Sequence, residues 1–400
     1  MKQKREMQVI YIITKLELGG AQKICLSLFK KIPTTSCTTS LITGAHGLLM
    51  QNITQNAAQD AAQDADSYIL TDLKREVSFL GCMSEIKTFI TLVKQLRKLK
   101  QKSHNTIVHT HSTKAGLLGR WAAFFAGIKQ RVHTIHGYSF HDKQAIVIRT
   151  IHYLLELITS FITTHYITVS SADVRTGIAL FPGFTYKHSL IRASVDDTYF
   201  EQNNQIMSFP IPNHPFIFGT VSCFKPQKNL IDLLKAFTVV HHQNKHTRLE
   251  IIGDGIQRPI IEQWLKEHNL TDAVILHGWQ HDVTTYLKRW HAFVLSSLWE
   301  GLPCAVVEAC LYKLPVVCYN TGGISDVIVS GSNGLLYPRT KWQELSQGMY
   351  KLTQDKQLYQ KLQNFNADLS DFAQSTMIMQ HQALYRHLIT QKLEQKQLRH

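Results

Sequence analysis

The chain has 400 residues, of which 44% are hydrophobic, and 43 Lys and Arg against 29 Asp and Glu give it a formal net charge of +14. This length predicts two folded domains, and the composition excludes a disordered tail, a collagen and a disulfide scaffold. Because only 18% of the residues are charged, the excess comes from scarce acids, and it indicates an anionic partner: nucleic acid, a nucleotide or acidic lipid headgroups.

Targeting signals and metal motifs are absent from the sequence. No stretch of about 18 apolar residues is free of charge, so we expect no transmembrane helix. The apolar run 9–13 is too short for a signal-peptide core. Seven cysteines without a C-x-x-C pair are typical of a reducing compartment, so we expect a cytoplasmic protein with structural thiols. We expect no metal, since the pair His109 and His111 alone is a weak ligand signal.

Short β-rich runs alternate with amphipathic stretches in the first half of the chain. Strands alternating with helices of 10–15 residues are typical of βαβ units and a parallel sheet. The polar run 52–66 is expected to be a surface loop or a short helix. The predicted strands are 8–14, 40–43, 67–70, 106–110, 131–135 and 165–169, and the predicted helices are 21–31, 85–100, 114–125 and 144–161.

A polar segment with three prolines, 201–215, interrupts this alternation and is expected to link two domains. From 341 onward the chain is expected to be helical and polar. Between the two lie predicted strands at 216–221, 248–252, 274–277, 292–295, 316–318 and 334–337, and predicted helices at 230–241, 258–267, 282–289 and 303–312.

These elements predict an α/β fold of two doubly wound, Rossmann-like parallel-sheet domains that face a central cleft. Ligands of such sheets bind at the carboxyl ends of the strands. We expect an N-terminal domain at 1–205 and a C-terminal domain at 206–380. A final helix, 381–400, could pack back on the N-terminal domain.

Two glycine turns follow predicted strands. Gly19 and Gly20 open a helix, where glycine lets backbone N–H groups approach an anion and the helix N-terminus adds partial positive charge. Gly253 lies in the turn IIGDG at the end of another strand. Ordinary strand-to-helix turns explain both patterns equally well.

The segment GTVSCFKPQKN, 219–229, ends a strand and leads into a helix. It carries Ser222, Lys225 and Lys228, and Asn229 can cap the following helix. A lysine just before a helix N-terminus suits a diphosphate. A solvated loop with two exposed lysines is the alternative.

The most specific motif is an E-x7-E segment formed by Glu300 and Glu308. Glu300 precedes a predicted helix, and Glu308 lies within that otherwise apolar helix. A glutamate in such a setting is rarely buried without a partner. At about 1.5 Å per residue, both carboxylates can reach one ligand and accept hydrogen bonds from two different polyol groups, such as a ribose and a hexose.

Together these segments resemble the retaining GT-B-fold glycosyltransferases of family four over nearly the whole chain. The E-x7-E segment and the downstream YNTGG at 319–323 carry most of the resemblance. In the first half, HTHSTKAG at 109–116 and HTIHG at 133–137 are similar to the branch that assembles bacterial surface polysaccharides. IRASVD at 191–196 resembles the loop before the interdomain linker.

The resemblance implies transfer of a hexosyl or N-acetylhexosaminyl group from a nucleotide sugar, expected to be UDP-linked, to a glycan or lipid-linked acceptor. It implies no cofactor and no metal, because cations and helix ends of the protein stabilise the diphosphate. A catalytically inactive nucleotide-sugar-binding or scaffold protein is the alternative, and a sugar-nucleotide epimerase fits the E-x7-E segment less well.

The resemblance also assigns roles to individual residues. His136 would lie near the anomeric carbon, Lys228 would neutralise the diphosphate, and Glu308 would bind the ribose. Glu300, with the backbone N–H groups of Gly301 and Leu302, would bind the transferred sugar. The base would lie near 278–281. Gly19, Gly20, Ser222 and Gly253 are also expected on the donor side, and His111 and Lys114 on the acceptor side.

The chain departs from the family pattern at two positions. Cys223 stands where an Arg usually shares the diphosphate with the lysine, and losing that contact could cost on the order of 2–4 kcal/mol in the barrier. Lys225 or Arg192 could compensate. Asp326 replaces the usual Glu after the Gly-Gly turn.

Two predicted helices suggest a membrane surface as a partner. The stretch 85–102 is basic and amphipathic, and 145–161 is largely apolar. Basic and apolar surface together suit peripheral binding to anionic lipid on the inner face of the cell membrane, although a domain surface explains 85–102 equally well. Nucleic acid is not expected as a partner, since the basic residues are dispersed and form no recognised motif.

Overall fold

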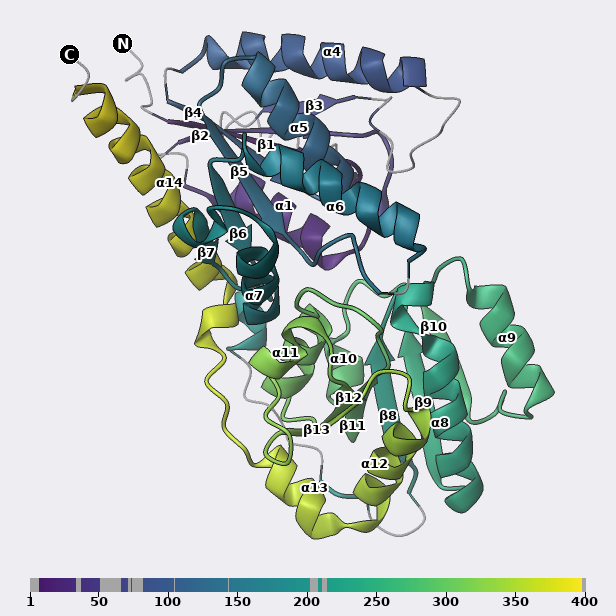
Figure 1. Ribbon diagram of the computed structural model, residues 1–400. Coiled ribbons are helices and arrows are strands. Elements are labelled where there is room, and N and C mark those ends of the chain that lie inside the picture. The colour runs from purple at the N-terminus through teal and green to yellow at the C-terminus, as the bar shows by residue number, and fades with distance from the viewer. Residues whose placement is uncertain are drawn as a thin grey trace. The chain divides into compact units, whose positions relative to one another are not determined.

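The computed structural model describes residues 7–33, 37–50, 66–70, 73, 82–103, 105–142, 144–201, 208–210 and 214–397. The chain divides into two compact units, Met1–Ser194 with Gln374–His400, and Val195–Ala373 (Figure 1). This division differs from the expected boundaries at 205/206 and 380/381. The second unit begins at Val195 because this residue already pairs with Ala373, the last residue of that unit. The N–H of Val195 donates to Phe372 O at 2.9 Å. The expected loop at 52–65 and most of the expected linker lie outside the described residues.

The first unit is built on a parallel sheet of seven strands in the order β3-β2-β1-β4-β5-β6-β7. Every residue of β1 and β4 is buried, which explains why most of their residues are apolar or β-branched. The strands are β1 Gln8–Ile13, β2 Thr38–Thr43, β3 Asp66–Ile69, β4 Thr106–His111, β5 Gln130–Ile135, β6 His165–Thr168 and β7 His188–Leu190. The helices are α1 Gly20–Lys31, α4 Cys82–Lys100, α5 Thr113–Phe125, α6 Ile146–Ser160, α7 Ser171–Leu180 and α14 Gln374–Gln397.

The second unit is built on a parallel sheet of six strands in the order β10-β9-β8-β11-β12-β13. The phenylalanines of β8 pack with α8 and α12 in its core. The strands are β8 Phe216–Val221, β9 Thr247–Ile252, β10 Val274–Gly278, β11 Ala292–Leu295, β12 Val316–Tyr319 and β13 Gly334–Tyr337. The helices are α8 Leu230–Gln243, α9 Arg258–Glu267, α10 Thr284–Leu287, α11 Cys304–Leu311, α12 Trp342–Gln354 and α13 Lys356–Gln363.

Both sheets reverse their strand order beside the first strand of the unit, which is the topological switch point of a doubly wound sheet. The predicted α/β class with two parallel sheets is therefore confirmed. The helix expected at 282–289 is shorter, because Asp282 accepts from the N–H of Thr284 at 2.8 Å and starts the helix there. Helix α7 and strand β7 were not predicted from the sequence.

The C-terminal helix α14 belongs to the first unit and begins at Gln374 rather than at 381. Tyr385 reaches the sheet, where its hydroxyl lies 2.6 Å from His109 Nδ1. The carbonyl of Leu388 accepts from Gln130 Nε2 at 2.7 Å. The last described helix therefore completes the core of the unit in which the chain begins (Figure 1).

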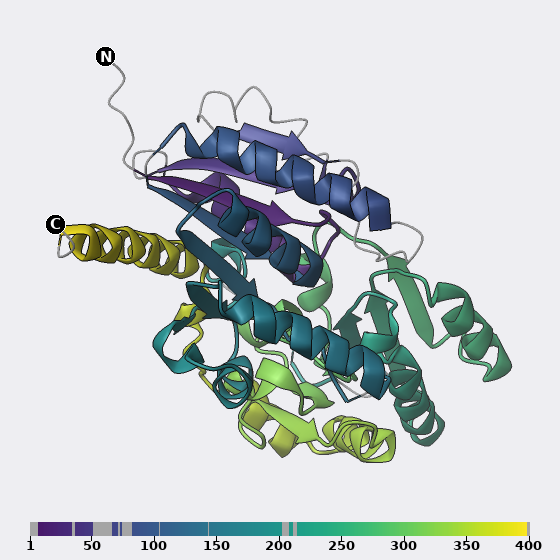
Figure 2. The same cartoon turned by 45° about the horizontal axis from the view of Figure 1, so that its top comes forward.

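Helices α4, α5 and α6 lie side by side on one face of the first sheet (Figures 1 and 2). A fully buried guanidinium joins α5 to α6: the two NH2 groups of Arg120 donate to the two carboxylate oxygens of Glu156 at 2.7 and 2.8 Å. Arg120 Nε also donates to Gly116 O at 2.8 Å. This two-pronged ion pair fixes which side of α6 faces the protein interior. No helix of the described residues is both long and apolar enough to cross a membrane.

The buried ion pair gives a stability prediction. We expect Glu156→Ala to lower the free energy of unfolding of the first unit by about 3–5 kcal/mol, because it leaves a buried guanidinium without its counter-charge. Urea denaturation followed by circular dichroism measures the change. The matched control is the exposed Glu262→Ala, whose half-buried partner Arg258 lies 3.0 Å away, with an expected loss of about 0–1 kcal/mol. Equal losses in the two variants would contradict the assignment.

Candidate active site

The carboxyl edge of the second sheet carries most of the predicted donor-side residues. Strand β8 ends at Val221, and a turn of 3-10 helix, Pro226–Lys228, leads into α8. Asn229 has the expected position before α8, but it adopts a left-handed conformation (φ 49°) and its side chain donates to Asp232 instead of capping the helix. The carbonyls of Lys228 and Asn229 both accept from Ser296 Oγ at 3.0 and 2.9 Å.

An ion pair joins two of the predicted catalytic residues. Lys228 Nζ lies 2.5 Å from Glu300 Oε1, and the two side chains are only 17% and 8% exposed. Lys228 follows β8 and Glu300 follows β11, which are neighbouring strands. Parallel strands that pair side by side thus bring a cation and a carboxylate to one point of the sheet edge.

The loop that carries Glu300 is held from its other side by the YNTGG segment. Thr321 Oγ1 donates to Leu298 O at 3.1 Å, and the N–H of Gly323 donates to Gly301 O at 2.6 Å. Gly322 has a φ of +55°, and a Cβ there would lie 1.9 Å from the carbonyl oxygen of Glu300. Only glycine fits this approach, which gives a physical reason why the two motifs occur together.

A second glycine turn brings three predicted regions together. Gly253 has a φ of +125°, and a Cβ there would lie 2.1 Å from the carbonyl oxygen of Ser222. Its N–H donates to Gly278 O at 2.8 Å, at the start of the segment 278–281. Ser222, Gly253 and the segment expected near the base are therefore neighbours.

Two buried hydroxyls mark the same edge of the sheet. Ser222 and Ser297 follow β8 and β11, and within the described part of the chain each Oγ is buried without a hydrogen-bond partner. Buried polar groups are normally paired, so unpaired ones at a strand end indicate a polar ligand. The sequence predicted Ser222 and missed Ser297, which has no local signature.

Glu308 lies on α11, where Val306, Val307 and Ala309 are buried while the glutamate is half-buried. Tyr199 is a neighbour that sequence reasoning missed. Burial raises the pKa of Tyr199 above its usual range, and the negative charge of Glu308 raises it further. The predicted Gly301 and Leu302 are buried just before this helix.

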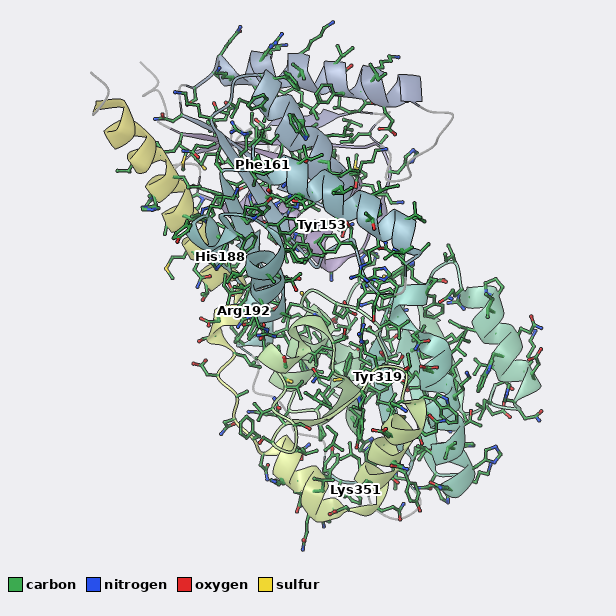
Figure 3. All side chains as sticks on the ribbon, viewed as in Figure 1. Tyr153, Phe161, His188, Arg192, Tyr319 and Lys351 are labelled. Atoms are coloured by element: carbon green, nitrogen blue, oxygen red, sulfur yellow. The ribbon has the colours of Figure 1, made fainter. Side chains whose placement is uncertain are left out.

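Cys223 is half-buried, and the N–H of Lys225 donates to its carbonyl at 2.8 Å. Of the two cations considered as substitutes for the usual Arg, Lys225 lies in the same loop. Arg192 belongs to the first unit, where its Nη2 lies 3.3 Å from Ser171 Oγ (Figure 3 labels Arg192). Arg258 is already engaged by Asp254 and Glu262.

In the first unit, the structure joins His111 and His136. A hydrogen bond connects His111 Nδ1 to His136 Nε2 at 3.0 Å, and the rings stack. Lys114, predicted on the acceptor side, forms a 2.5 Å ion pair with Glu85 of α4. Gly19 occupies the N-cap position of α1, and Gly20 begins that helix.

These histidines belong to a buried network that extends to α14. His109 bonds Tyr385 through Nδ1 and Thr134 through Nε2, and His381 stacks against its ring. Burial, helped by the neighbouring His381, lowers the pKa of His136 to about 3, and burial lowers that of His381 to about 4. His136 is therefore a neutral imidazole at pH 7. The distant His381 and Tyr385 could not be connected to this site by sequence spacing.

No group of three or more His, Cys, Asp or Glu side chains that could hold a metal ion occurs among the residues the structure describes.

Residues 201–368 match the model of the family "Glycosyl transferases group 1". The chain is also 28% identical over 351 residues to the UDP-Gal:alpha-D-GlcNAc-diphosphoundecaprenol alpha-1,3-galactosyltransferase of Escherichia coli, covering 85% of this chain and 86% of that protein. The capsular polysaccharide biosynthesis glycosyltransferase CapM of Staphylococcus aureus is 23% identical over 72% of the chain and 75% of its own length.

The chain is similar to known glycosyltransferases, and its fold is GT-B. Its fold matches the sucrose-phosphate synthase of Thermosynechococcus elongatus with a TM-score of 0.77 at 17% identity, over 96% of this chain and all of that one. It matches Anabaena HepE, solved in complex with UDP and glucose, with a TM-score of 0.73 at 17% identity, over 94% of this chain and 98% of that one. The predicted similarity to GT-B glycosyltransferases and the predicted GT-B fold are confirmed.

The neutral histidines predict acid sensitivity of the first unit. Their pKa values lie below the usual 6.5, so their contribution to stability is present above pH 6.5 and is lost as the pH falls. We expect the free energy of unfolding to fall by up to roughly 1.4 kcal/mol per pH unit for each such histidine below about pH 6.

Urea denaturation at a series of pH values measures this slope. His381→Phe should reduce it, whereas His46→Gln, at an exposed position of the same unit, should not. A slope that is the same in both variants would show that His381 is not buried in its neutral form.

Proposed function

We propose that this glycosyltransferase moves a hexosyl or N-acetylhexosaminyl group from a UDP-sugar to a glycan or lipid-linked acceptor, with retention at the anomeric carbon. The observation that carries the proposal is the ion pair between Lys228 and Glu300, next to two buried and unpaired serine hydroxyls. The named activity of the Escherichia coli relative and the UDP bound to HepE support the donor class.

On the donor side, the ammonium of Lys228 neutralises the diphosphate as it leaves. A preorganised cation next to developing negative charge lowers the activation free energy by several kcal/mol. Glu300 and the N–H groups of Gly301 and Leu302 bind hydroxyls of the transferred sugar. The existing ion pair holds both side chains at the sheet edge before the donor arrives, so little reorganisation is needed.

The nucleoside occupies the neighbouring part of this edge. Glu308 accepts hydrogen bonds from the ribose hydroxyls, and Ser222 and Gly253 line the approach of the diphosphate and the nucleoside. The base lies against 278–281, where Trp279 offers an exposed ring. Gly19 and Gly20, at the N-terminus of α1, contribute backbone N–H groups from the first unit.

His136 acts near the anomeric carbon as a neutral hydrogen-bonding group, because its pKa lies far below 7. His111 bonds its ring and sets which nitrogen carries the proton. We assign no protein nucleophile to the reaction. The diphosphate leaves and the acceptor attacks on the same face of an oxocarbenium-like sugar. His111 and Lys114 are the residues proposed on the acceptor side.

We assign the reaction to surface-polysaccharide synthesis on the cytoplasmic side of the cell membrane. The names of two relatives support this: a diphosphoundecaprenol-linked acceptor in one and capsular polysaccharide in the other. The first of these names also favours a lipid-linked acceptor over a free glycan.

A donor panel with purified enzyme tests the site. We expect Glu300→Ala and Lys228→Ala each to lower kcat by roughly 10²–10³-fold with the preferred donor, since each removes a contact to the sugar or the leaving group. Glu267→Ala, on the exposed surface of α9, is the control and should retain full turnover. Undiminished turnover in Glu300→Ala would contradict the site assignment.

Cys223 supports a second candidate function, a nucleotide-sugar-binding or scaffold protein with impaired catalysis. Cys223→Arg distinguishes the two. If the enzyme is active but slow, the arginine should raise turnover about tenfold or more, because it adds a charge-assisted contact to the leaving diphosphate. Tight donor binding measured by calorimetry, with no turnover in either form, would favour the binding role.

A further inference from the structure

Helix α6 is amphipathic, but it is turned with its polar side inward. Its buried residues are Glu156, Thr159 and Ser160. Glu156 pairs with the buried Arg120, and Thr159 Oγ1 accepts from Trp121 Nε1 at 3.0 Å. The fully buried contacts of the helix are therefore polar. Only Tyr153 and Leu157 add half-buried apolar contacts to the unit, and the other apolar side chains of the helix are left outward.

The outward side is an unbroken apolar stripe. Val147, Ile151, Leu154, Ile158 and Phe161 follow one another at the three- and four-residue spacing of a single helix face. Together with Ile148 and Leu155 they are between 44% and 73% exposed. Figure 3 labels Phe161 at the C-terminal end of this helix. Contiguous exposed apolar surface of this kind marks a binding face.

The stripe continues onto the two neighbouring helices. Phe124 and Phe125 at the end of α5 are 46% and 53% exposed. Phe125 packs edge-on against Phe89 of α4, on which Ile86 and Ile90 are also exposed. We call this surface, formed by the outward sides of α6, the end of α5 and α4, the α4–α6 face (Figures 1 and 2).

Positive charge accompanies the α4–α6 face. Residues 82–161 contain twelve Lys and Arg and only three Asp and Glu. Two of these three acids are paired within the unit, Glu85 with Lys114 and Glu156 with Arg120. Exposed basic residues lie beside the apolar ones: Lys87, Lys94, Arg97, Lys98, Lys129 and Arg149.

We propose that the α4–α6 face docks on an anionic lipid surface, with the α6 stripe in the interface between headgroups and acyl chains. Helices that bind such surfaces insert their apolar side chains into the membrane and surround them with Lys and Arg. Helix α6, about 22 Å long at 1.5 Å per residue, lies along the membrane and does not cross it.

Charge complementarity selects the lipid over a second copy of the chain. A second copy would bring the same basic residues opposite these, with almost no acid to neutralise them, and like charges facing each other are costly. Phosphate headgroups supply the missing negative charge, and the acyl region covers the apolar stripe. Docking on lipid would serve the proposed function, because it would bring the enzyme to a lipid-linked acceptor, and in this respect it rests on that function. Binding to vesicles needs neither the donor nor the acceptor, so it can be measured separately.

Flotation with lipid vesicles tests the docking. The full chain should float with phosphatidylcholine vesicles that contain phosphatidylglycerol and not with phosphatidylcholine alone. Ile151→Gln combined with Ile158→Gln should weaken binding about tenfold or more, since two partly inserted side chains become polar. Lys94→Gln combined with Lys98→Gln should weaken the salt-sensitive part of binding.

Matched controls lie in the second unit. Ile256→Gln with Ile260→Gln changes two isoleucines that are at least as exposed as Ile151 and Ile158, and Lys266→Gln with Lys351→Gln changes two exposed lysines; both pairs should bind as the wild type does. Thermal unfolding confirms that every variant is folded.

Three outcomes would overturn the proposal. They are no flotation of the wild type with anionic vesicles, undiminished flotation of the Ile151 and Ile158 variant, and a wild-type dimer in sedimentation equilibrium that this variant abolishes. Vesicle binding without turnover on any donor would instead contradict the proposed function and leave the docking intact.

Discussion

The Lys228–Glu300 ion pair is the contact on which the second unit's site depends. It joins two loops that are 72 residues apart in the chain but follow adjacent strands. Each loop is then fixed by further contacts: Ser296 holds the carbonyls of Lys228 and Asn229, and Gly322 allows the YNTGG segment to approach Glu300. The charges of the site are therefore placed by strand pairing and backbone contacts, with no need for a ligand to assemble them.

Sequence patterns predicted most of the sheets and half of this site, for identifiable reasons. Buried parallel strands are rich in apolar and β-branched residues, so β1, β4 and β8 were located nearly to the residue. Strand β7 was missed because it is short and not buried, and α7 because the residues that it buries, Asp173 and Gly177, are not apolar. Motif spacing found Lys228 and Glu300, but their direct contact follows from strand order, which spacing alone does not give.

The first unit was less predictable, because its buried polar residues form hydrogen bonds with residues that are distant in the sequence. Spacing placed His111 and His136 at strand ends, but not the network that keeps them neutral, which depends on His381 and Tyr385. Similarly, the apolar character of 145–161 was evident, whereas the side of α6 that faces outward is decided by one buried arginine, Arg120. A hydrophobic pattern shows that a helix has an apolar side, but a buried charge can decide whether that side faces the protein or the solvent.

The attachment of α14 to the first sheet has a consequence for the order in which the protein is made. During synthesis, N-terminal domains generally fold as soon as they emerge. Here β1 is translated well before α14, so the buried Tyr11 and His109 lack the hydroxyl of Tyr385 until 374 and 276 residues later in the chain. The second unit is complete at Ala373 and can fold before the first one closes. The unit that contains β1 is therefore completed after the unit that follows it.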